Sequence, residues 1–118
     1  MILAINNVEA AALTLHMSIM RKNFKKLLKK KYKEQQDDYL QAYNYVVTEA
    51  AYVLEQQIDS YQMHLNIVDL QVLNEFLRAY TNKADEEVKK AMKPGQEDPL
   101  QALKDLCEQC EELLAGVS

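Results

Sequence analysis

The sequence predicts an all-α protein, and three observations carry that prediction. Glycine and proline, the main helix breakers, do not occur before Pro94. Apolar residues recur three and four positions apart, the spacing that places side chains on one face of a helix. No segment alternates apolar and polar residues around a turn pair, so no strands are expected. We therefore expect one domain, 1–118, folded as an antiparallel up-and-down bundle of four helices.

The first helix is expected over about residues 7–33. Asn6 can cap it, and Glu9 can complete a capping box. Two apolar seams run along it: Ile5, Val8, Ala12, Leu15 and Ile19 form the first, and Leu13, Met20, Phe24 and Leu27 form the second. Lysines crowd its last turns, where cations suit the partial negative charge of a helix end.

The second helix, expected over about 38–63, is the central one. Its main apolar stripe consists of Leu40, Val47, Ala51, Leu54, Ile58, Tyr61 and Leu65, and beside it lie Tyr39, Tyr43, Val46, Ala50 and Val53. This arc covers nearly half of the helix surface, so we expect neighbours on two sides. The helix is expected to break near Asn66, which can cap a new helix with Asp69 at its third position. A break at 81–85 is the alternative.

The third helix is expected over about 67–93, where Pro94 and Gly95 end it. The fourth is expected over about 99–115, with Asp98 as its cap and Pro99 in its first position. Its apolar stripe consists of Leu100, Leu103, Cys107, Cys110 and Leu114.

The two cysteines form a CxxC motif, Cys107 to Cys110, inside the fourth helix. In redox enzymes the first cysteine of this motif sits at a helix N-terminus, where its pKa is lowered. Here both fall on the leucine stripe, so we expect them to pack in the core. A zinc site with His16 and His64, or redox activity, is the alternative. No phosphate loop or nucleophile arrangement is recognisable, so no catalytic, cofactor-binding or metal residues are assigned and no enzyme activity is expected.

A basic run of residues closes the first helix. It contains Arg21, Lys22, Lys25, Lys26, Lys29, Lys30, Lys31 and Lys33, with no acidic residue among them. Such a segment can bind nucleic acid or another anionic partner. The net charge of −4 and the lack of a helix-turn-helix pattern weaken that interpretation. The simpler interpretation is a solvated helix end that neutralises the acids opening the second helix.

The outer face of the second helix is the surface that the sequence favours for protein binding. Tyr45, Tyr52 and Met63 lie opposite its core stripe, and no lysine or arginine occurs from 34 to 77. Interfaces are enriched in tyrosine and methionine and depleted in lysine. Further candidates for this interface are Val68, Val72 and Phe76.

The functional expectation is a non-enzymatic bundle that binds protein, either as a homo-oligomer or as a small regulatory or chaperone-like adaptor. A nucleic-acid-associated protein that uses 21–33 comes second, and a metal- or redox-active bundle that uses Cys107 and Cys110 comes third. The apolar start, Met1 to Ile5, is too short for a secretory signal, and no apolar run is long enough to span a membrane. A cytoplasmic location is therefore expected.

Overall fold

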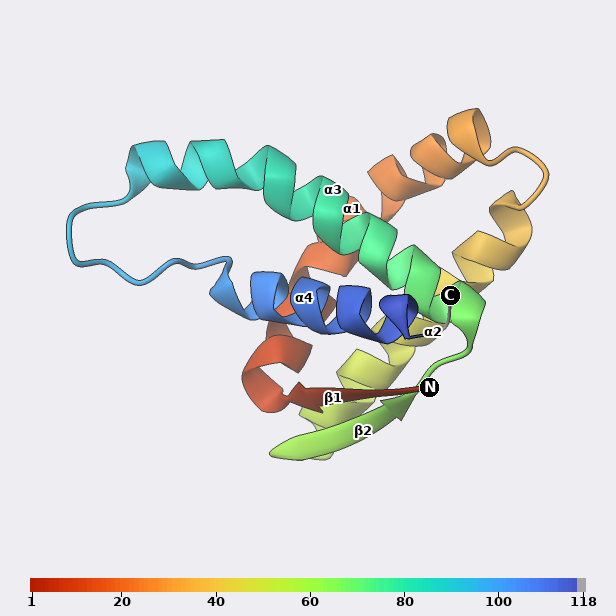
Figure 1. The fold of residues 1–118 in the computed structure, drawn as a ribbon, viewed down its shortest axis with the longest axis horizontal. Coiled ribbons are helices and arrows are strands. Elements are labelled where there is room, and N and C mark those ends of the chain that lie inside the picture. Colours follow the sequence, from red (N-terminus) through yellow and green to blue (C-terminus); the bar gives the residue numbers. More distant parts are fainter. Residues whose placement is uncertain (117–118) are drawn as a thin grey trace.

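The computed structural model describes residues 1–116, which form a four-helix bundle with a small two-stranded sheet (Figure 1). The elements, in chain order, are β1 (Ile2–Asn6), α1 (Asn7–Lys31), α2 (Gln36–Glu55), β2 (Ser60–His64), α3 (Ile67–Ala91) and α4 (Gln101–Ala115). Each helix packs against the next in sequence, and α4 returns to α1. The predicted all-α bundle is confirmed, whereas the prediction that no strand forms is wrong.

Capping boxes start the two longest helices. The Glu9 N–H donates to Asn6 Oδ1 at 2.7 Å, and the Asn6 N–H donates to Glu9 Oε1 at 2.9 Å. The second box has the same design: the Asp69 N–H donates to Asn66 Oδ1 at 2.8 Å, and the Asn66 N–H donates to Asp69 Oδ2 at 3.1 Å. Each box satisfies two backbone donors that a helix end leaves open. Both predicted caps, and with them the break near Asn66, are confirmed.

The second helix ends eight residues earlier than its predicted end near 63. It stops at Glu55, and Gln57 adopts a left-handed backbone (φ 53°) that turns the chain away. Residues 60–64 then form β2, which pairs antiparallel with β1 from Ile2↔His64 to Asn6↔Ser60. The helical spacing of Ile58, Tyr61 and Leu65 therefore does not reflect a helix. Local sequence could not show this, because the pairing strand lies about sixty residues away in the chain.

Side chains from α4 and α2 hold the outer sides of the sheet. Gln109 lies between the two cysteines of α4 and reaches β1, accepting from the Ala4 N–H at 2.8 Å and donating to the Ala4 carbonyl oxygen at 2.9 Å. An edge strand otherwise presents unpaired backbone groups. On β2, the carbonyl oxygen of His64 accepts a hydrogen bond from the Tyr45 hydroxyl of α2 at 2.9 Å.

An aromatic cluster lies where α1, α2 and α3 meet. The ring of Tyr43 stacks on Phe24 with centroids 4.7 Å apart, and Phe76 packs edge-on against both. The Tyr43 hydroxyl donates to the carbonyl oxygen of Met17 at 2.6 Å, so this buried polar group is satisfied. The fully buried stripe of α2 is therefore Tyr43, Val46, Ala50 and Val53, while most of the stripe predicted as the main one is half-buried.

The fourth helix starts two residues later than expected. Asp98 does not cap it; its carboxylate accepts from the Leu100 N–H at 2.9 Å within the preceding turn. The same carboxylate and that of Asp85 both pair with Lys104, which fastens this turn to α3.

Replacing Gln109 with methionine tests the tie between α4 and β1. Gln109→Met keeps the shape of the side chain but removes both hydrogen bonds to Ala4, so we expect the free energy of unfolding to fall by about 1–2 kcal/mol. Urea denaturation measures this change, with the exposed neighbour change Glu108→Gln as the control. A loss no larger than that of the control would show that the bonds to β1 contribute nothing.

Candidate functional site

The outer face of α1 is the most exposed apolar surface of the bundle. Val8, Leu15 and Ile19 are 65%, 56% and 66% exposed, although all three are large aliphatic residues. Leu15 lies two residues from both Leu13 and Met17, which are completely buried. Two residues turn an α-helix by about 200°, so Leu15 points almost directly away from the core. The first of the two seams predicted for this helix thus faces solvent along most of its length.

This part of α1 carries no charged residue on either side. Residues 10–20 include no Asp, Glu, Lys or Arg, and their buried members Ala10, Leu13 and Met17 face the core. A helix that is apolar all round is normally covered all round, whereas here one side has no cover within residues 1–116. This surface was not predicted from the sequence. Two apolar seams on one helix do not show how many helices pack against it, or which seam stays exposed. The uncharged stretch was the available signal.

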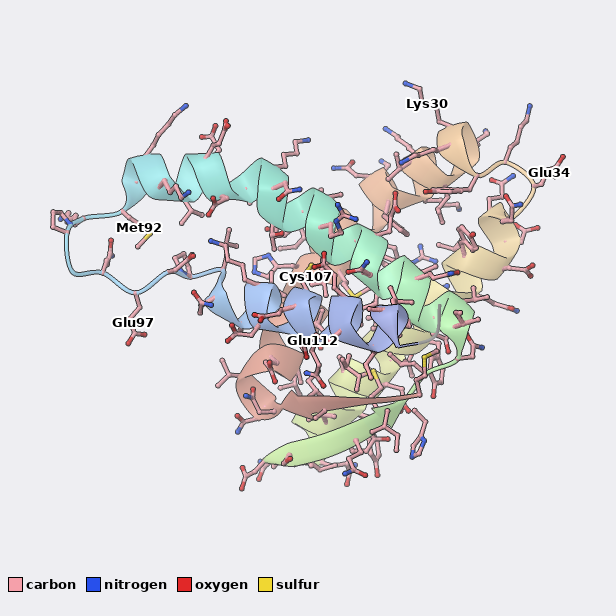
Figure 2. The ribbon with its side chains drawn as sticks, in the orientation of Figure 1. Lys30, Glu34, Met92, Glu97, Cys107 and Glu112 are labelled. Atoms are coloured by element: carbon pink, nitrogen blue, oxygen red, sulfur yellow. The ribbon has the colours of Figure 1, made fainter. Side chains whose placement is uncertain are left out.

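The same face becomes basic in the second half of α1. Lys22, Lys25, Lys26, Lys29 and Lys30 are exposed there, as is Lys33 in the loop that follows. Figure 2 shows Lys30 at the tip of the α1–α2 hairpin, pointing away from the bundle. Within residues 1–116 none of these six lysines forms an ion pair. These six lysines are solvated, as the simpler interpretation expects, but they form no direct ion pair with the acids of the second helix within residues 1–116.

Two members of the predicted basic patch do have partners. Lys31 Nζ lies 3.3 Å from Glu75 Oε1 of α3, and this hydrogen-bonded partner raises the pKa of Lys31. The Arg21 guanidinium donates through Nε to Asn44 Oδ1 of α2 at 2.9 Å. The outer face of α1 thus consists of an apolar half with Val8, Leu15 and Ile19, followed by a basic half. The exposed lysines of that basic half, for which no ion pair is found within residues 1–116, are Lys22, Lys25, Lys26, Lys29 and Lys30.

The tyrosine face of α2 serves partly as the support of β2. Tyr45 and Tyr52 are exposed as predicted, at 39% and 44%, but Met63 is completely buried. It was placed on this face on the assumption that the helix continues, whereas it lies on the inner side of β2. The Tyr61 ring of that strand packs against Tyr52 with centroids 6.0 Å apart. Use of Tyr45 and Tyr52 as an interface stays a prediction.

The further interface candidates on α3 lie in or against the core and do not form an exposed surface. Val72 and Phe76 are 2% and 3% exposed and belong to the core, and Val68 is half-buried against it. The helix α3 packs against both α2 and α4, which explains why its first half is apolar over most of its circumference.

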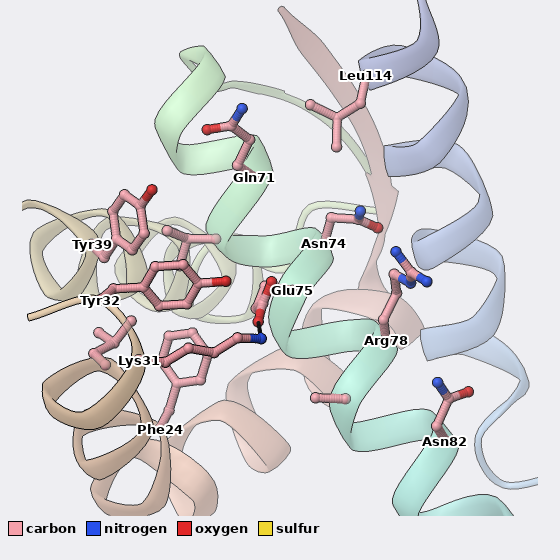
Figure 3. A pocket seen from close by; sticks show the side chains of 13 residues that line it. Phe24, Lys31, Tyr32, Tyr39, Gln71, Asn74, Glu75, Arg78, Asn82 and Leu114 are labelled. Atoms are coloured by element: carbon pink, nitrogen blue, oxygen red, sulfur yellow. Dashed lines mark hydrogen bonds and ion pairs between the residues drawn. The ribbon is translucent and has the colours of Figure 1, made fainter. Parts of the chain in front are cut away.

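A groove of about 550 Å³ opens between the end of α1 and α3 (Figure 3). Phe24, Tyr32 and Tyr39 line one wall, and polar residues of α3 line the other. The Lys31–Glu75 pair crosses it, and Arg78 on its rim lies 3.6 Å from Glu111 of α4. None of its lining residues is a serine, cysteine or histidine, so the groove has no Ser–His or Cys–His pair.

The cysteines are placed for packing. Cys110 is completely buried and Cys107 is half-buried. Burial raises the pKa of the Cys107 thiol and raises that of Cys110 to about 12, so both are protonated at neutral pH. A redox cysteine needs the opposite shift, because the thiolate is the nucleophile. The position expected from sequence, on the inner stripe of the fourth helix, is correct for Cys110 and only partly so for Cys107.

The two histidines lie in other elements than the cysteines: His16 in α1 and His64 in β2. His16 Nδ1 is 2.7 Å from the Tyr80 hydroxyl of α3, and burial lowers the pKa of this histidine. Within residues 1–116, no three side chains of His, Cys, Asp or Glu come close enough together to hold a metal ion.

Comparison with known proteins adds no assignment. The chain matches no protein-family model, no curated protein and no solved structure. Among the helices of residues 1–116, none combines the length and apolar character needed to cross a bilayer.

Thiol labelling tests the packing role of the cysteines. We expect the native protein to react slowly at Cys107 and not at Cys110, and both to react quickly in denaturant, because burial keeps the thiols protonated and covered. Cys110→Ala should lower the free energy of unfolding by about 1–2 kcal/mol, more than Cys107→Ala does. Rapid labelling of both cysteines in the native protein would instead support redox chemistry.

Proposed function

We propose that this chain is a non-enzymatic helical-bundle protein that acts by binding protein through the outer face of α1. The observation that carries the proposal is the row Val8, Leu15 and Ile19, exposed on a helix whose residues 10–20 include no charged side chain. Glu9, next to Val8, is engaged in the capping box with Asn6. Isolated exposed aliphatic residues are ordinary on protein surfaces. Three along one helix face, with no charge among them, form the kind of centre that protein interfaces bury.

Burial of this apolar row in an interface would contribute a measurable part of the binding free energy. Removing a fully exposed valine, leucine or isoleucine from water contributes roughly 1.5–3 kcal/mol, and these three are more than half exposed. Part of that gain offsets the entropy lost on association, so the row alone supports moderate affinity. The groove beside Tyr32 and Tyr39 lies on a different side of the bundle end and is a second place for contact.

The order of residues along α1 favours protein over a membrane or nucleic acid. A helix that lies on a membrane carries its apolar and basic residues on opposite faces. Here both kinds occupy one face, the apolar row before Lys22 and the lysines after it. Nucleic-acid binding would use the lysines alone and would leave the apolar row uncovered.

A paired substitution tests the proposal. Leu15→Glu with Ile19→Glu places two carboxylates in the row, and we expect it to abolish association, with itself or with a recovered partner, because charges would be buried. Sedimentation velocity measures the mass, and thermal melting followed by circular dichroism checks the fold. Since both positions are exposed, the melting temperature should stay within a few degrees of that of the original protein.

The matched control is Tyr52→Glu, which places the same charge on another exposed position. It should leave association intact. Association that survives the paired substitution but fails in Tyr52→Glu would contradict the proposal and favour the tyrosine face of α2.

A further inference from the structure

We propose that the occupant of the α1 outer face is a second copy of this chain, packed antiparallel about a two-fold axis beside Leu15. The proposal rests on the proposed protein-binding function of this face and names its partner. Two features support it: the sizes of the side chains along the face, and the positions of charges at its two ends.

The exposed residues of the face are spaced for helix-to-helix packing. Val8, Ala11, Leu15, Ser18 and Lys22 are all exposed and follow the three-and-four spacing of a coiled-coil seam. About an axis at Leu15, the antiparallel register sets Ile19 of one copy against Ala11 of the other. It also sets Ala12 against Ser18, and Leu15 against its own equivalent. A large residue thus meets a small one on each side of a central leucine pair, which lets the two helices approach closely.

The position of α2 determines which charges flank this seam. Its Asn44 is bonded to Arg21 of α1, and the two helices run antiparallel. Glu55 comes eleven residues after Asn44, so it lies beside α1 near Ala10. Asp59 immediately precedes Ser60, which pairs with Asn6 ahead of α1. The N-terminal end of the face is therefore flanked by acids, whereas its C-terminal end carries the unpaired lysines.

An antiparallel arrangement brings these opposite charges together. Lys22 of one copy lies across from Val8 of the other, and helical side chains lean toward their own N-terminus. Its ammonium group therefore approaches the level of Ala11 in the other copy, which is also the level at which the antiparallel register of α2 brings the exposed Glu55. Asp59 similarly falls opposite the turn that contains Lys25. A parallel pair would instead set lysines against lysines, so the charges select the antiparallel dimer.

Charge exchange across the seam tests the arrangement. Lys22→Glu and Glu55→Lys, made singly, should each weaken the dimer about tenfold, since each change reverses two equivalent pairs in a two-fold assembly. The double variant Lys22→Glu/Glu55→Lys should recover most of the affinity. Sedimentation equilibrium over a concentration series measures the dissociation constant, and Lys90→Glu on the exposed end of α3 is the control.

Disulfide trapping locates the axis independently. In a Cys107→Ser/Cys110→Ala background, Leu15→Cys should form a covalent dimer under mild oxidation, because the two copies of that position face each other. Tyr52→Cys should remain monomeric under the same conditions. The background variant must first show the same helical circular dichroism as the original protein.

The outcomes separate the two proposals. A protein that stays monomeric at every concentration, yet loses a recovered partner through Leu15→Glu/Ile19→Glu, overturns the dimer and keeps the proposed function. A dimer that is trapped through Tyr52→Cys, or is indifferent to both charge reversals, also overturns this arrangement. If the paired Glu substitution changes neither mass nor any binding, both the dimer and the proposed function fail.

Discussion

The antiparallel pairing of β1 with β2 determines where both long helices begin. Its register, from Ile2↔His64 to Asn6↔Ser60, joins two segments separated by the whole of α1 and α2. Because the strands are antiparallel, α1 leaves one end of the ribbon and α3 leaves the other, about 15 Å apart. A capping box then starts each helix directly after its strand. Gln109 and Tyr45 secure the ribbon to α4 and α2, so the ribbon is joined to all four helices.

This geometry leaves α1 with more apolar surface than the bundle can cover. The helix packs on α2 along one side and on α4 and the sheet near its start, and its inner residues Leu13 and Met17 are fully buried. The opposite side has no neighbour within residues 1–116, and there Leu15 and Ile19 meet solvent. We interpret this uncovered side as the binding surface of the protein. We propose that the lysines that follow on the same face orient the partner.

Much of the helical framework could be predicted because it depends on local signals. Asn6 with Glu9 and Asn66 with Asp69 are capping boxes readable from four residues each, and Pro94-Gly95 follows the end of α3 closely. The strands could not be predicted in the same way. Ile2 and Ala4 are apolar on the exposed side of β1, which hides its alternation, and Tyr61 and Met63 continue the helical spacing of α2. Each of these two segments forms a strand because it pairs with the other, which is distant in the sequence.

The binding surface was harder to predict than the fold for a related reason. An apolar residue on a helix is interpreted as part of the core unless the number of neighbouring helices is known, and the spacing of Val8 and Leu15 fits a core seam. The placement of Met63 in the predicted site on α2 was wrong because Met63 belongs to the strand that α2 supports, and the Tyr45 hydroxyl donates to that strand. Residue type alone pointed to an interface, and the partner of Tyr45 inside the chain became visible only in the structure.

Solvent accessibility of the α1 methyl groups, measured in solution, tests the central claim most directly. Methyl NMR with a soluble paramagnetic agent reports how closely solvent approaches the side chains of Leu15, Ile19 and the reference residue Ile67, which is 41% exposed. As the protein concentration rises, we predict that the Leu15 and Ile19 methyls become protected while the Ile67 methyls stay accessible. If all three remain equally accessible at every concentration, and also when a recovered partner is added, the outer face of α1 is not a binding surface.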